Sequence, residues 1–385
     1  MKVQRKESNF LVILKENDDM KLIICGDMSV ENESVGYFEK GDYKAAFGDV
    51  ADIFHKADRS IINLECAITE SEKEIKKYGP CLKGPINTAK TLKDAGVTDC
   101  MLSNNHIFDY GVKGLKDTIV ALNDNGIEWN GVGNNYEDSR QNHIIKKDGL
   151  TITIINVCEH EYSYATQSRC GARPFDEFET MHDIREAKKN ADYVIVIYHG
   201  GKEFCRYPSP RLMKACREMV RCGADAVFCQ HSHCIGCYEV FEGATILYGQ
   251  GNFHFAKSGK DASWYEGLVL ELDVTKENLD IKFIPVICEK GTLRICDAKT
   301  SKEILDDFSE RSEELKNGKW KEGWHEYCVS VHDIYKRAFC NHKIEDDEDE
   351  TQVFSHYVDC EAHTDVWKEL FPTWNATNEL DVEFY

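Results

Sequence analysis

The chain has 385 residues, which is long enough for one large domain with an appendage. Charged residues make up 30% and hydrophobic residues 42%, a balance typical of soluble globular proteins. The net charge of −21 argues against nucleic acid as a partner, and any acidic polymer would need a local basic patch to bind.

The amino-terminal apolar run at residues 10–14 is too short for a signal peptide, and no later run reaches membrane-spanning length. The chain has 17 cysteines, several of them inside apolar strand patterns, which favours free thiols in a reducing compartment. Cys234 and Cys237 form an isolated C-x-x-C motif, which we interpret as core thiols rather than a redox pair or zinc knuckle. We therefore expect a cytoplasmic protein without a membrane anchor.

Strand and helix patterns alternate through the first two thirds of the chain. Short apolar runs predict strands at 21–25, 60–65, 99–102, 127–130, 143–146, 150–157, 192–198, 224–229, 238–240, 245–248, 268–274 and 281–286. Helices are predicted at 43–57, 87–95, 112–122, 178–190 and 209–223, with Ser209 as an N-cap and Gly96 at a C-terminal end. The early alternation predicts a largely parallel sheet. The later strands lack intervening helices, so we expect them to form a second, antiparallel sheet.

The composition changes near residue 300, where charged helices are predicted at 303–316 and 321–339. A run of six acidic residues follows at 345–350, and we interpret it as a solvated loop because it lacks the glycine turn of a calcium-binding loop. Aromatic residues in the last thirty positions predict packing against the main domain; they are Trp367, Phe371, Trp374, Phe384 and Tyr385.

Five of the predicted strands end at residues that can bind metals. These ends carry Asp27, Glu65, Asn104-Asn105-His106, His199 and Gln230-His231-Ser232-His233. In open α/β sheets, sites form beyond the carboxyl ends of the strands, so we expect the side chains to gather in one cavity. An H-x-H pair alone is more often two loop histidines than a metal site, but its position at a fifth strand end favours the metal site.

The candidate ligands combine carboxylate, amide oxygen and imidazole, which suits Mn(II), Fe(II) or Zn(II). They are Asp27, Glu65, Asn105, His199, His231 and His233. Six ligands are too many for one tetrahedral metal, and a bridging carboxylate would let them hold two divalent transition metals. Two metals about 3.5–4 Å apart can share a hydroxide and lower the pKa of water to near 7.

Two residues are candidates for proton transfer. His106 directly follows Asn105 and cannot easily share its direction, so we interpret it as a general acid for the leaving group, or else as a histidine that positions Asn105. Asp109 would orient His106, or cap the helix that contains Val112. Geometry decides between these alternatives.

Five further residues are candidates for substrate contact. Lys83 and Arg173 carry the charge that an anionic substrate needs, although such side chains usually face solvent. Asn104 and Glu161 follow strand ends. Asn252 lies in a turn, where it would either line the same cavity or serve only to form the turn.

Seven short segments, taken in order, resemble the CapA-type poly-gamma-glutamate capsule synthesis proteins, a branch of the calcineurin-like metallophosphoesterase superfamily. They are Cys25-Gly26-Asp27, Asn63-Leu64-Glu65-Cys66, Gly79-Pro80-Cys81-Leu82-Lys83, residues 103–111, His199-Gly200-Gly201, His231-Ser232-His233 and Gly251-Asn252-Phe253. The resemblance covers about residues 20–290. It implies a four-layer α/β/β/α sandwich with a dinuclear metal site, Glu65 as the bridging carboxylate and an Asn105-His106 pair.

The chain departs from the family pattern at Asp27-Met28-Ser29, where the superfamily usually has Asp-x-His, and at Gln230, where relatives often have another histidine. Together these features predict a catalytic domain at 1–295 and a mostly helical, acidic extension at 296–385 packed on it. The predicted function is a metal-dependent hydrolase acting on a phosphoester or gamma-glutamyl amide of an anionic polymer or small substrate. The alternative is a non-catalytic subunit that binds or assembles the polymer in capsule synthesis.

Overall fold

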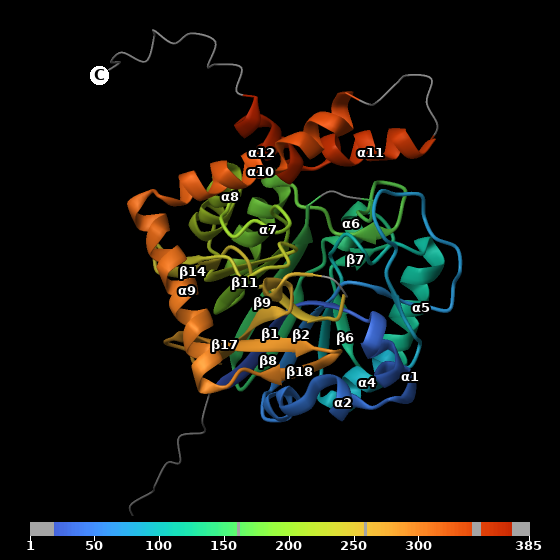
Figure 1. Cartoon of the computed structure of the whole chain (residues 1–385). Coiled ribbons are helices and arrows are strands. Elements are labelled where there is room, and N and C mark those ends of the chain that lie inside the picture. Colours follow the sequence, from blue (N-terminus) through green and yellow to red (C-terminus); the bar gives the residue numbers. More distant parts are fainter. Residues whose placement is uncertain (1–18, 160–161, 258–259, 341–347, 372–385) are drawn as a thin grey trace, which may run out of the picture.

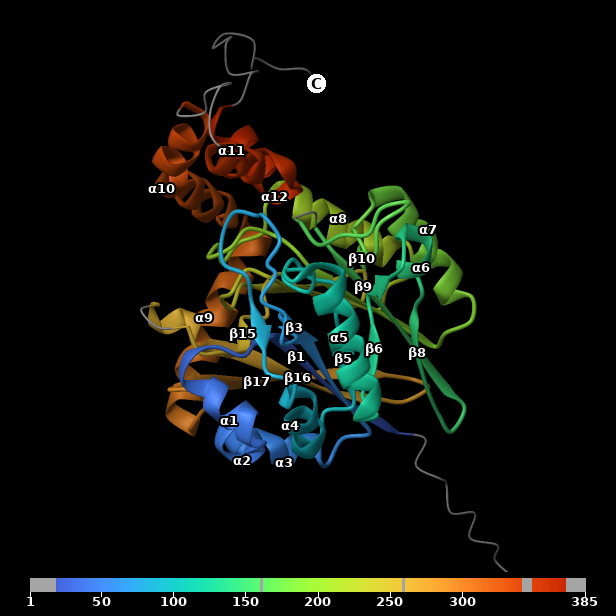
Figure 2. The ribbon, with the colours of Figure 1, turned by 90° about the vertical axis from the view of Figure 1, so that its right-hand side faces the viewer.

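The computed structural model describes residues 19–159, 162–257, 260–340 and 348–371. Two large β-sheets face each other, and helices cover the outer face of each (Figures 1 and 2). Three hydrophobic cores fill the spaces between these layers. The predicted four-layer α/β/β/α sandwich with a helical C-terminal extension is therefore confirmed.

The first sheet has the strand order β18-β17-β16-β1-β2-β5-β6, and β15 pairs with the end of β1. Its strands are β1 (Met20–Ser29), β2 (Arg59–Leu64), β5 (Asp99–Met101), β6 (Glu128–Asn130), β15 (Asn252–Phe255), β16 (Glu266–Val274), β17 (Leu279–Glu289) and β18 (Thr292–Ile295). Strands β1, β2, β5 and β6 are parallel, so their carboxyl ends meet at one edge of the sheet.

The second sheet has the order β13-β14-β12-β11-β9-β8. Its strands are β8 (His143–Lys147), β9 (Leu150–Cys158), β11 (Tyr193–His199), β12 (Ala226–Gln230), β13 (Tyr238–Phe241) and β14 (Ala244–Leu247). Two short ribbons complete the strands, β3 (Ala67–Ile68) with β4 (Lys83–Gly84) and β7 (Val132–Gly133) with β10 (Gly171–Ala172).

The helices form the outer layers. Those near the first sheet are α1 (Val35–Lys40), α2 (Tyr43–Phe47), α3 (Ala51–Phe54), α4 (Thr88–Ala95) and α5 (Gly111–Asp124). The second sheet is covered by α7 (Glu177–Lys188) and α8 (Pro210–Arg221), and α6 (Tyr136–Ser139) lies beside β7. Short 3₁₀ turns occur at Asn32–Ser34, Gly48–Val50 and Ala262–Trp264.

Alternation along β1 shows how one strand serves two cores. Leu22 and Ile24 face the core between the two sheets, whereas Ile23 faces the core beneath the helices. Successive side chains of a strand point to opposite faces, so a strand buried on both sides is apolar throughout. This explains why the sequence shows continuous apolar runs at these strands.

The prediction of a separate antiparallel second sheet was wrong. Strands β16, β17 and β18 are antiparallel, but they extend the first sheet from β1. In the second sheet β9, β11, β12 and β14 are parallel to one another. The apolar pattern of a strand reveals which faces are buried and does not reveal which strand pairs with it, so the partner was inferred incorrectly.

The helix predicted at 43–57 is broken into α2, a 3₁₀ turn and α3. The break falls at Gly48, whose φ of 49° lies in the left-handed region that favours glycine. A Cβ atom there would lie 2.4 Å from the carbonyl oxygen of Leu293, so the backbone of β18 approaches too closely for another residue. Other helix ends follow the prediction, since Ser209 caps α8 and accepts a hydrogen bond from the Leu212 N–H.

The C-terminal extension consists of α9 (Ala298–Asn317), α10 (Trp320–Cys340), α11 (Glu348–Asp359) and α12 (Glu361–Leu370). Of the acidic run predicted to be a loop, 348–350 instead begin α11, and 345–347 lie outside the described residues. The partly buried Trp367 packs on the core beside the second sheet, whereas Trp374, Phe384 and Tyr385 lie outside the described residues. None of the helices in the described ranges is long and apolar enough to cross a bilayer.

The extension contributes to two of the three cores. Ile304 and Phe308 of α9 pack into the core between the sheets, and Trp324 of α10 packs into the core outside the second sheet. The division of the chain at residue 295 stays a prediction about its organisation.

Candidate metal centre

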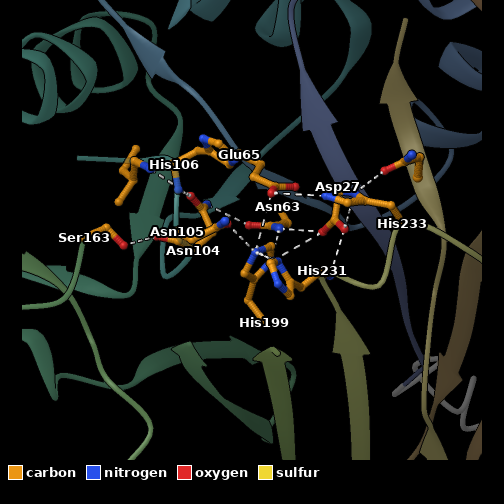
Figure 3. Close-up of polar contacts among 12 residues, drawn as sticks. Asp27, Asn63, Glu65, Asn104, Asn105, His106, Ser163, His199, His231 and His233 are labelled. Carbon is orange, nitrogen blue, oxygen red and sulfur yellow. Dashed lines mark hydrogen bonds and ion pairs between the residues drawn. The ribbon is translucent and has the colours of Figure 1, made fainter. Parts of the chain in front are cut away.

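The six predicted ligands come together between the two sheets, at the carboxyl ends of their strands (Figure 3). The first sheet provides three of them, from β1 and from the segments after β2 and β5: Asp27, Glu65 and Asn105. The second sheet provides the last residue of β11 and two residues after β12: His199, His231 and His233. All six are at least 93% buried.

The acidic and imidazole ligands form two triads that share Glu65. One triad is Asp27, Glu65 and His199, and the other is Glu65, His231 and His233; within each, the potential ligand atoms lie within 4.8 Å of one another. The Oε1 atom of Glu65 lies 3.5 Å from His199 Nε2 and 3.8 Å from His233 Nε2. A shared carboxylate between two sets of donors is the arrangement that a pair of cations requires.

Neither carboxylate oxygen of Glu65 has a hydrogen-bond partner among the described residues, although both are buried. Burial raises the pKa of Glu65 well above its ordinary value, and the nearby charge of Asp27 adds to this shift. Buried polar atoms are almost always paired, so an orphaned carboxylate beside imidazole nitrogens fits a divalent transition metal. The residues present therefore fit the predicted cofactor, whose identity and number stay open.

Asp27 is held as an ionised acceptor. Its Oδ1 accepts a hydrogen bond from Asn63 Nδ2 at 2.7 Å, and its Oδ2 accepts one from the His231 N–H at 2.8 Å. Burial opposes ionisation, but His199, His233 and Asn63 lower the pKa of Asp27 to about 2. A carboxylate that is both ionised and fixed in direction is suited to binding a cation.

His231 and His233 reach the centre from an uncommon backbone conformation. Their φ angles are 80° and 52°, so both lie in the left-handed region rather than in an extended strand. Such conformations are costly for residues with a side chain and cluster at functional sites. The two rings nevertheless lie with their centroids 5.8 Å apart.

Asn252 orients His233. The Asn252 amide donates to the Trp264 carbonyl at 2.8 Å, which turns its Oδ1 toward His233 Nδ1 at 2.9 Å. His233 Nδ1–H therefore donates to Asn252, and Nε2 is left with its lone pair facing Glu65. In the structure Asn252 contacts this candidate ligand, and its contact with substrate stays a prediction.

Asn63 was missed as a site residue. Its Nδ2 donates to Asp27 and, at 3.0 Å, to His199 Nδ1, while His199 Nε2 lies 2.9 Å from Asn105 Oδ1. The Oδ1 atom of Asn63 accepts from Asn104 at 3.0 Å. A signal was present in the sequence, because Asn63 stands two residues before Glu65 and is a polar residue near the end of an otherwise apolar, buried run.

His106 pairs with Asp109. This contact corresponds to the alternative in which Asp109 orients His106. The Nδ1 atom of His106 lies 2.6 Å from Asp109 Oδ2. The N-cap of α5 is Tyr110, so Asp109 does not cap that helix. Sequence reasoning missed Lys77, whose buried ammonium donates to Asp109 Oδ1 at 2.6 Å and lies 3.2 Å from His106 Nδ1. Burial and the Lys77 charge lower the pKa of His106 to about 4.

The other predicted substrate residues make their polar contacts with the protein itself. Asn104 donates to Asn63 and to the Leu64 carbonyl, and its Oδ1 accepts from two backbone N–H groups of the next turn. The buried Arg173 pairs with Asp183 at 2.6 Å. Their role toward a substrate stays a prediction.

Lys83 contacts Ser71 and Glu72 through its ammonium, at 2.9 and 2.8 Å. Glu161 lies outside the described residues. Gln230, which departs from the family pattern, donates to the Cys25 carbonyl at 3.0 Å and so ties β12 to β1. Cys234 and Cys237 are buried free thiols, and burial raises the pKa of both.

A third acidic and histidine group does not fit a metal as well. Asp99 accepts from Arg59 Nε at 2.8 Å and lies 2.7 Å from His143 Nε2, with Glu128 also close to Arg59. The Arg59 guanidinium already supplies the positive charge that these carboxylates need. This group is therefore a salt-bridge network.

Comparison with known proteins agrees with this geometry. The family described as "Bacterial capsule synthesis protein PGA_cap" matches residues 21–257, a range that contains all six candidate ligands. The capsule biosynthesis protein CapA of Bacillus anthracis is 29% identical over 262 residues, covering 66% of this chain and 64% of that protein. The PGA biosynthesis protein CapA of Bacillus subtilis strain 168 is 29% identical over 248 residues, covering 62% and 64%.

The chain thus spans a little under two thirds of the length of these relatives. Among solved structures, a candidate 5′-nucleotidase from Staphylococcus aureus, in complex with alpha-ketoglutarate, matches with a TM-score of 0.44 and 16% identity, covering 75% of this chain and 58% of that one. The family match spans more than half of the sequence and includes the strand ends that carry the six candidate ligands. The chain belongs to the bacterial capsule synthesis protein family PGA_cap.

Proposed function

We propose that the chain is a metal-dependent hydrolase that acts on a phosphoester or a gamma-glutamyl amide. The observation that carries this proposal is the buried, unpartnered carboxylate of Glu65 between two sets of donors. When bound, divalent transition metals would supply an activated water at neutral pH and a positive charge for the substrate oxygens. Asp27, Glu65, Asn105, His199, His231 and His233 would hold them.

The residues beside this centre support proton transfer to the leaving group. Asp109 fixes His106 through Nδ1, so the other ring nitrogen is available to a substrate. Lys77 holds Asp109 from its other oxygen, and the Leu82 N–H donates to Asp109 at 2.7 Å. With three fixed contacts on Asp109, His106 has a defined direction, which is what a general acid requires. Asp109 is thus a positioning residue in this proposal.

The experiment is a panel of phosphodiester and gamma-glutamyl substrates with Mn(II)-loaded protein. We expect turnover that falls by about 10²–10⁴ in His106→Ala, the range of a lost general acid, while metal content is unchanged. His332→Ala, a change at an exposed histidine of α10, serves as the matched control. Turnover that is equal in His106→Ala and in the wild type would show that His106 is not the acid.

The second candidate function is a non-catalytic subunit that binds or assembles an anionic polymer. The observation that favours it is Ser29, which is fully buried at the position where the Asp-x-His pattern of the superfamily has its histidine, and whose hydroxyl is a weaker ligand for a transition metal than an imidazole. Saturable binding of poly-gamma-glutamate by the metal-loaded protein, with no turnover anywhere on the panel, would favour this function over the hydrolase.

We also propose that the protein works in a reducing compartment such as the cytoplasm. Fourteen of the 17 cysteines are buried, among them Cys216 and Cys229 with sulfur atoms 3.6 Å apart. Many buried cysteines that pack as small apolar side chains support a reducing environment. Thiol titration of protein extracted under alkylating conditions tests this, and disulfides in the freshly extracted chain would argue against it.

A further inference from the structure

A buried carboxylate of the C-terminal extension joins the extension to the second sheet. Asp365 of α12 accepts hydrogen bonds from the Ser209 hydroxyl at 2.6 Å and from Arg211 Nε at 2.9 Å, both at the start of α8. In Figures 1 and 2, α12 lies beside α8, in agreement with these contacts. Arg211 Nη2 also donates to Glu159 Oε1 at 2.5 Å. One guanidinium therefore connects a helix of the extension to the residue that follows β9.

Glu159 lies directly against the strand end that carries His199. The Glu159 N–H donates to the His199 carbonyl at 2.9 Å, one position beyond the pairing of Cys158 with His199 in β9 and β11. The Glu159 side chain covers the next residue, because a Cβ atom at Gly200 would lie 2.7 Å from Glu159 Cγ. This close approach accounts for the first glycine of His199-Gly200-Gly201, which the metal centre itself does not explain.

Tyr198 completes these contacts on the outer face of the second sheet. Its hydroxyl donates to Glu159 Oε1 at 2.6 Å, and its ring belongs to the core outside this sheet. Successive residues of a strand point to opposite faces, and the next ring, that of His199, faces Glu65 on the inner side (Figure 3). The contacts of Tyr198 thus lie directly behind a candidate metal ligand.

We call Asp365, Arg211, Glu159 and Tyr198 the rear network, and its buried charges are a costly way to attach a helix. Glu159 and Asp365 are 5% and 6% exposed and share one guanidinium, and Glu159 Oε2 has no hydrogen-bond partner among the described residues. Burying paired charges often costs as much free energy as their attraction returns. Apolar residues of α12 such as Val366 already attach the extension to this core. The charged hydrogen bonds add a fixed direction, which apolar contacts do not.

We propose that the rear network positions His199 for metal binding, so that the C-terminal extension contributes to the affinity of the centre without providing a ligand. The network contacts His199 through its main chain and not through its ring, and its members are therefore positioning residues. Outer contacts of this kind fix the orientation of a ligand and tune the affinity of the site. The proposal rests on the proposed function for the presence of metals and adds a role for α12.

A positioning role should affect one metal and spare the other. His199 forms a triad with Asp27 and Glu65, whereas the second triad consists of Glu65, His231 and His233. Displacement of His199 should weaken only the metal that the first triad holds. A general loss of stability would instead weaken both, so the two dissociation constants distinguish a positioning role from a merely structural one.

The first measurement is a Mn(II) titration of the full chain in competition with a chelating indicator, which gives the dissociation constant of each metal. Arg211→Met removes the guanidinium that joins the two carboxylates. Arg217→Met is the matched control, because Arg217 lies on the same helix and forms a bidentate pair with Glu239 at 2.8 and 2.7 Å. If Arg211→Met does not fold, Asp365→Asn carries the test, with Glu369→Gln on the same helix as its control.

The second measurement needs no metal. The Glu159 N–H is bonded to the His199 carbonyl, so its hydrogen exchange in the metal-free protein reports how firmly the strand end is held. We expect this exchange to be at least about tenfold faster in Arg211→Met than in the wild type, because the buried carboxylates lose their shared partner. Exchange in Arg217→Met should stay within about threefold of the wild type.

We expect Arg211→Met to weaken one Mn(II) dissociation constant by about 10-fold to 100-fold and to leave the other within about threefold. Equal weakening of both constants, or of neither, overturns the proposal, and so does unchanged exchange of the Glu159 N–H. A wild type that binds no Mn(II) would refute the proposed function. Faster exchange in Arg211→Met would then still support the hold of the rear network on the strand end.

Discussion

Replacing Glu65 by glutamine should stabilise the metal-free protein while removing its response to metal. In the fold without metal, the Glu65 carboxylate is buried and without hydrogen-bond partners among the described residues. Its pKa is raised above the ordinary value of 4.5, so the ionised form is disfavoured in the folded state. Below pH 4.5 the carboxyl group is protonated in both states and its ionisation costs the folded state nothing. As the pH rises, this cost grows and the folded state loses stability. At pH 7 the wild type bears this cost, and Glu65→Gln does not bear the charged part of it.

The size of the effect follows from the burial of the carboxylate. An unsatisfied buried polar group costs about 1–3 kcal/mol, and more when it is charged, so we expect Glu65→Gln to raise the free energy of unfolding of the metal-free protein by about that much. Metal should stabilise the wild type more than it stabilises Glu65→Gln. At a free metal concentration about 100 times the Kd, binding stabilises the wild type by about 2.7 kcal/mol. The variant should lose most of this gain because its amide is neutral.

Thermal unfolding of both proteins at pH 7, with chelator and with Mn(II), measures how their stabilities differ without and with metal. Glu70→Gln is the matched control, because Glu70 is exposed and lies five residues along the same segment. A Glu65→Gln protein that is less stable than the wild type in chelator would refute the reasoning. So would an equal gain from Mn(II) in the two proteins.

Three further predictions concern groups near the centre or in its frame. Burial lowers the pKa of His106 and of His254 to about 4, so their contribution to stability is present above pH 6.5 and is lost as the pH falls toward 4. Urea unfolding between pH 7 and pH 5 should show this loss of stability, up to about 1.4 kcal/mol per group and pH unit. His254→Gln should make the free energy of unfolding less dependent on pH, whereas the exposed control His332→Gln should not. Lys77→Met should raise the pKa of His106, because the ammonium beside that ring lowers it, and an NMR titration of His106 that is unmoved would contradict the contact. Arg173→Ala should lower the free energy of unfolding by about 3–5 kcal/mol, because it leaves Asp183 with one partner fewer. The metal content of this variant should be unchanged. A variant of normal stability with a raised KM would instead favour the predicted substrate role of Arg173.

The ligand set was predictable because each ligand stands where an apolar run ends. A parallel strand fixes the place of the residue that follows it, so Glu65 after β2 and Asn105 after the neighbouring β5 had to lie at the same edge of the first sheet. The pairing of β16 with β1 had no such signal, because an apolar strand is compatible with several partners. The fold class was therefore more accessible to prediction than the order of its strands.

The residues that were missed carry their information in three dimensions. Lys77 lies in a stretch of charged residues typical of a solvated loop, and only the fold shows that its ammonium is buried against Asp109. The left-handed backbone at His231 and His233 gives no sequence signal, since neither is glycine. The contact between His356 and Tyr78 joins segments almost 280 positions apart, and no local pattern predicts it.

The central claim is that the buried acidic and imidazole side chains of both sheets bind metals around Glu65. Crystals of the protein purified without chelator, measured at the absorption edges of Mn, Fe and Zn, test it most directly. We expect anomalous peaks on both sides of the Glu65 carboxylate, within ligand distance of His199 and of His233. A chain that carries no transition metal, or whose metal lies at the Asp99, Glu128 and His143 group instead, would contradict it.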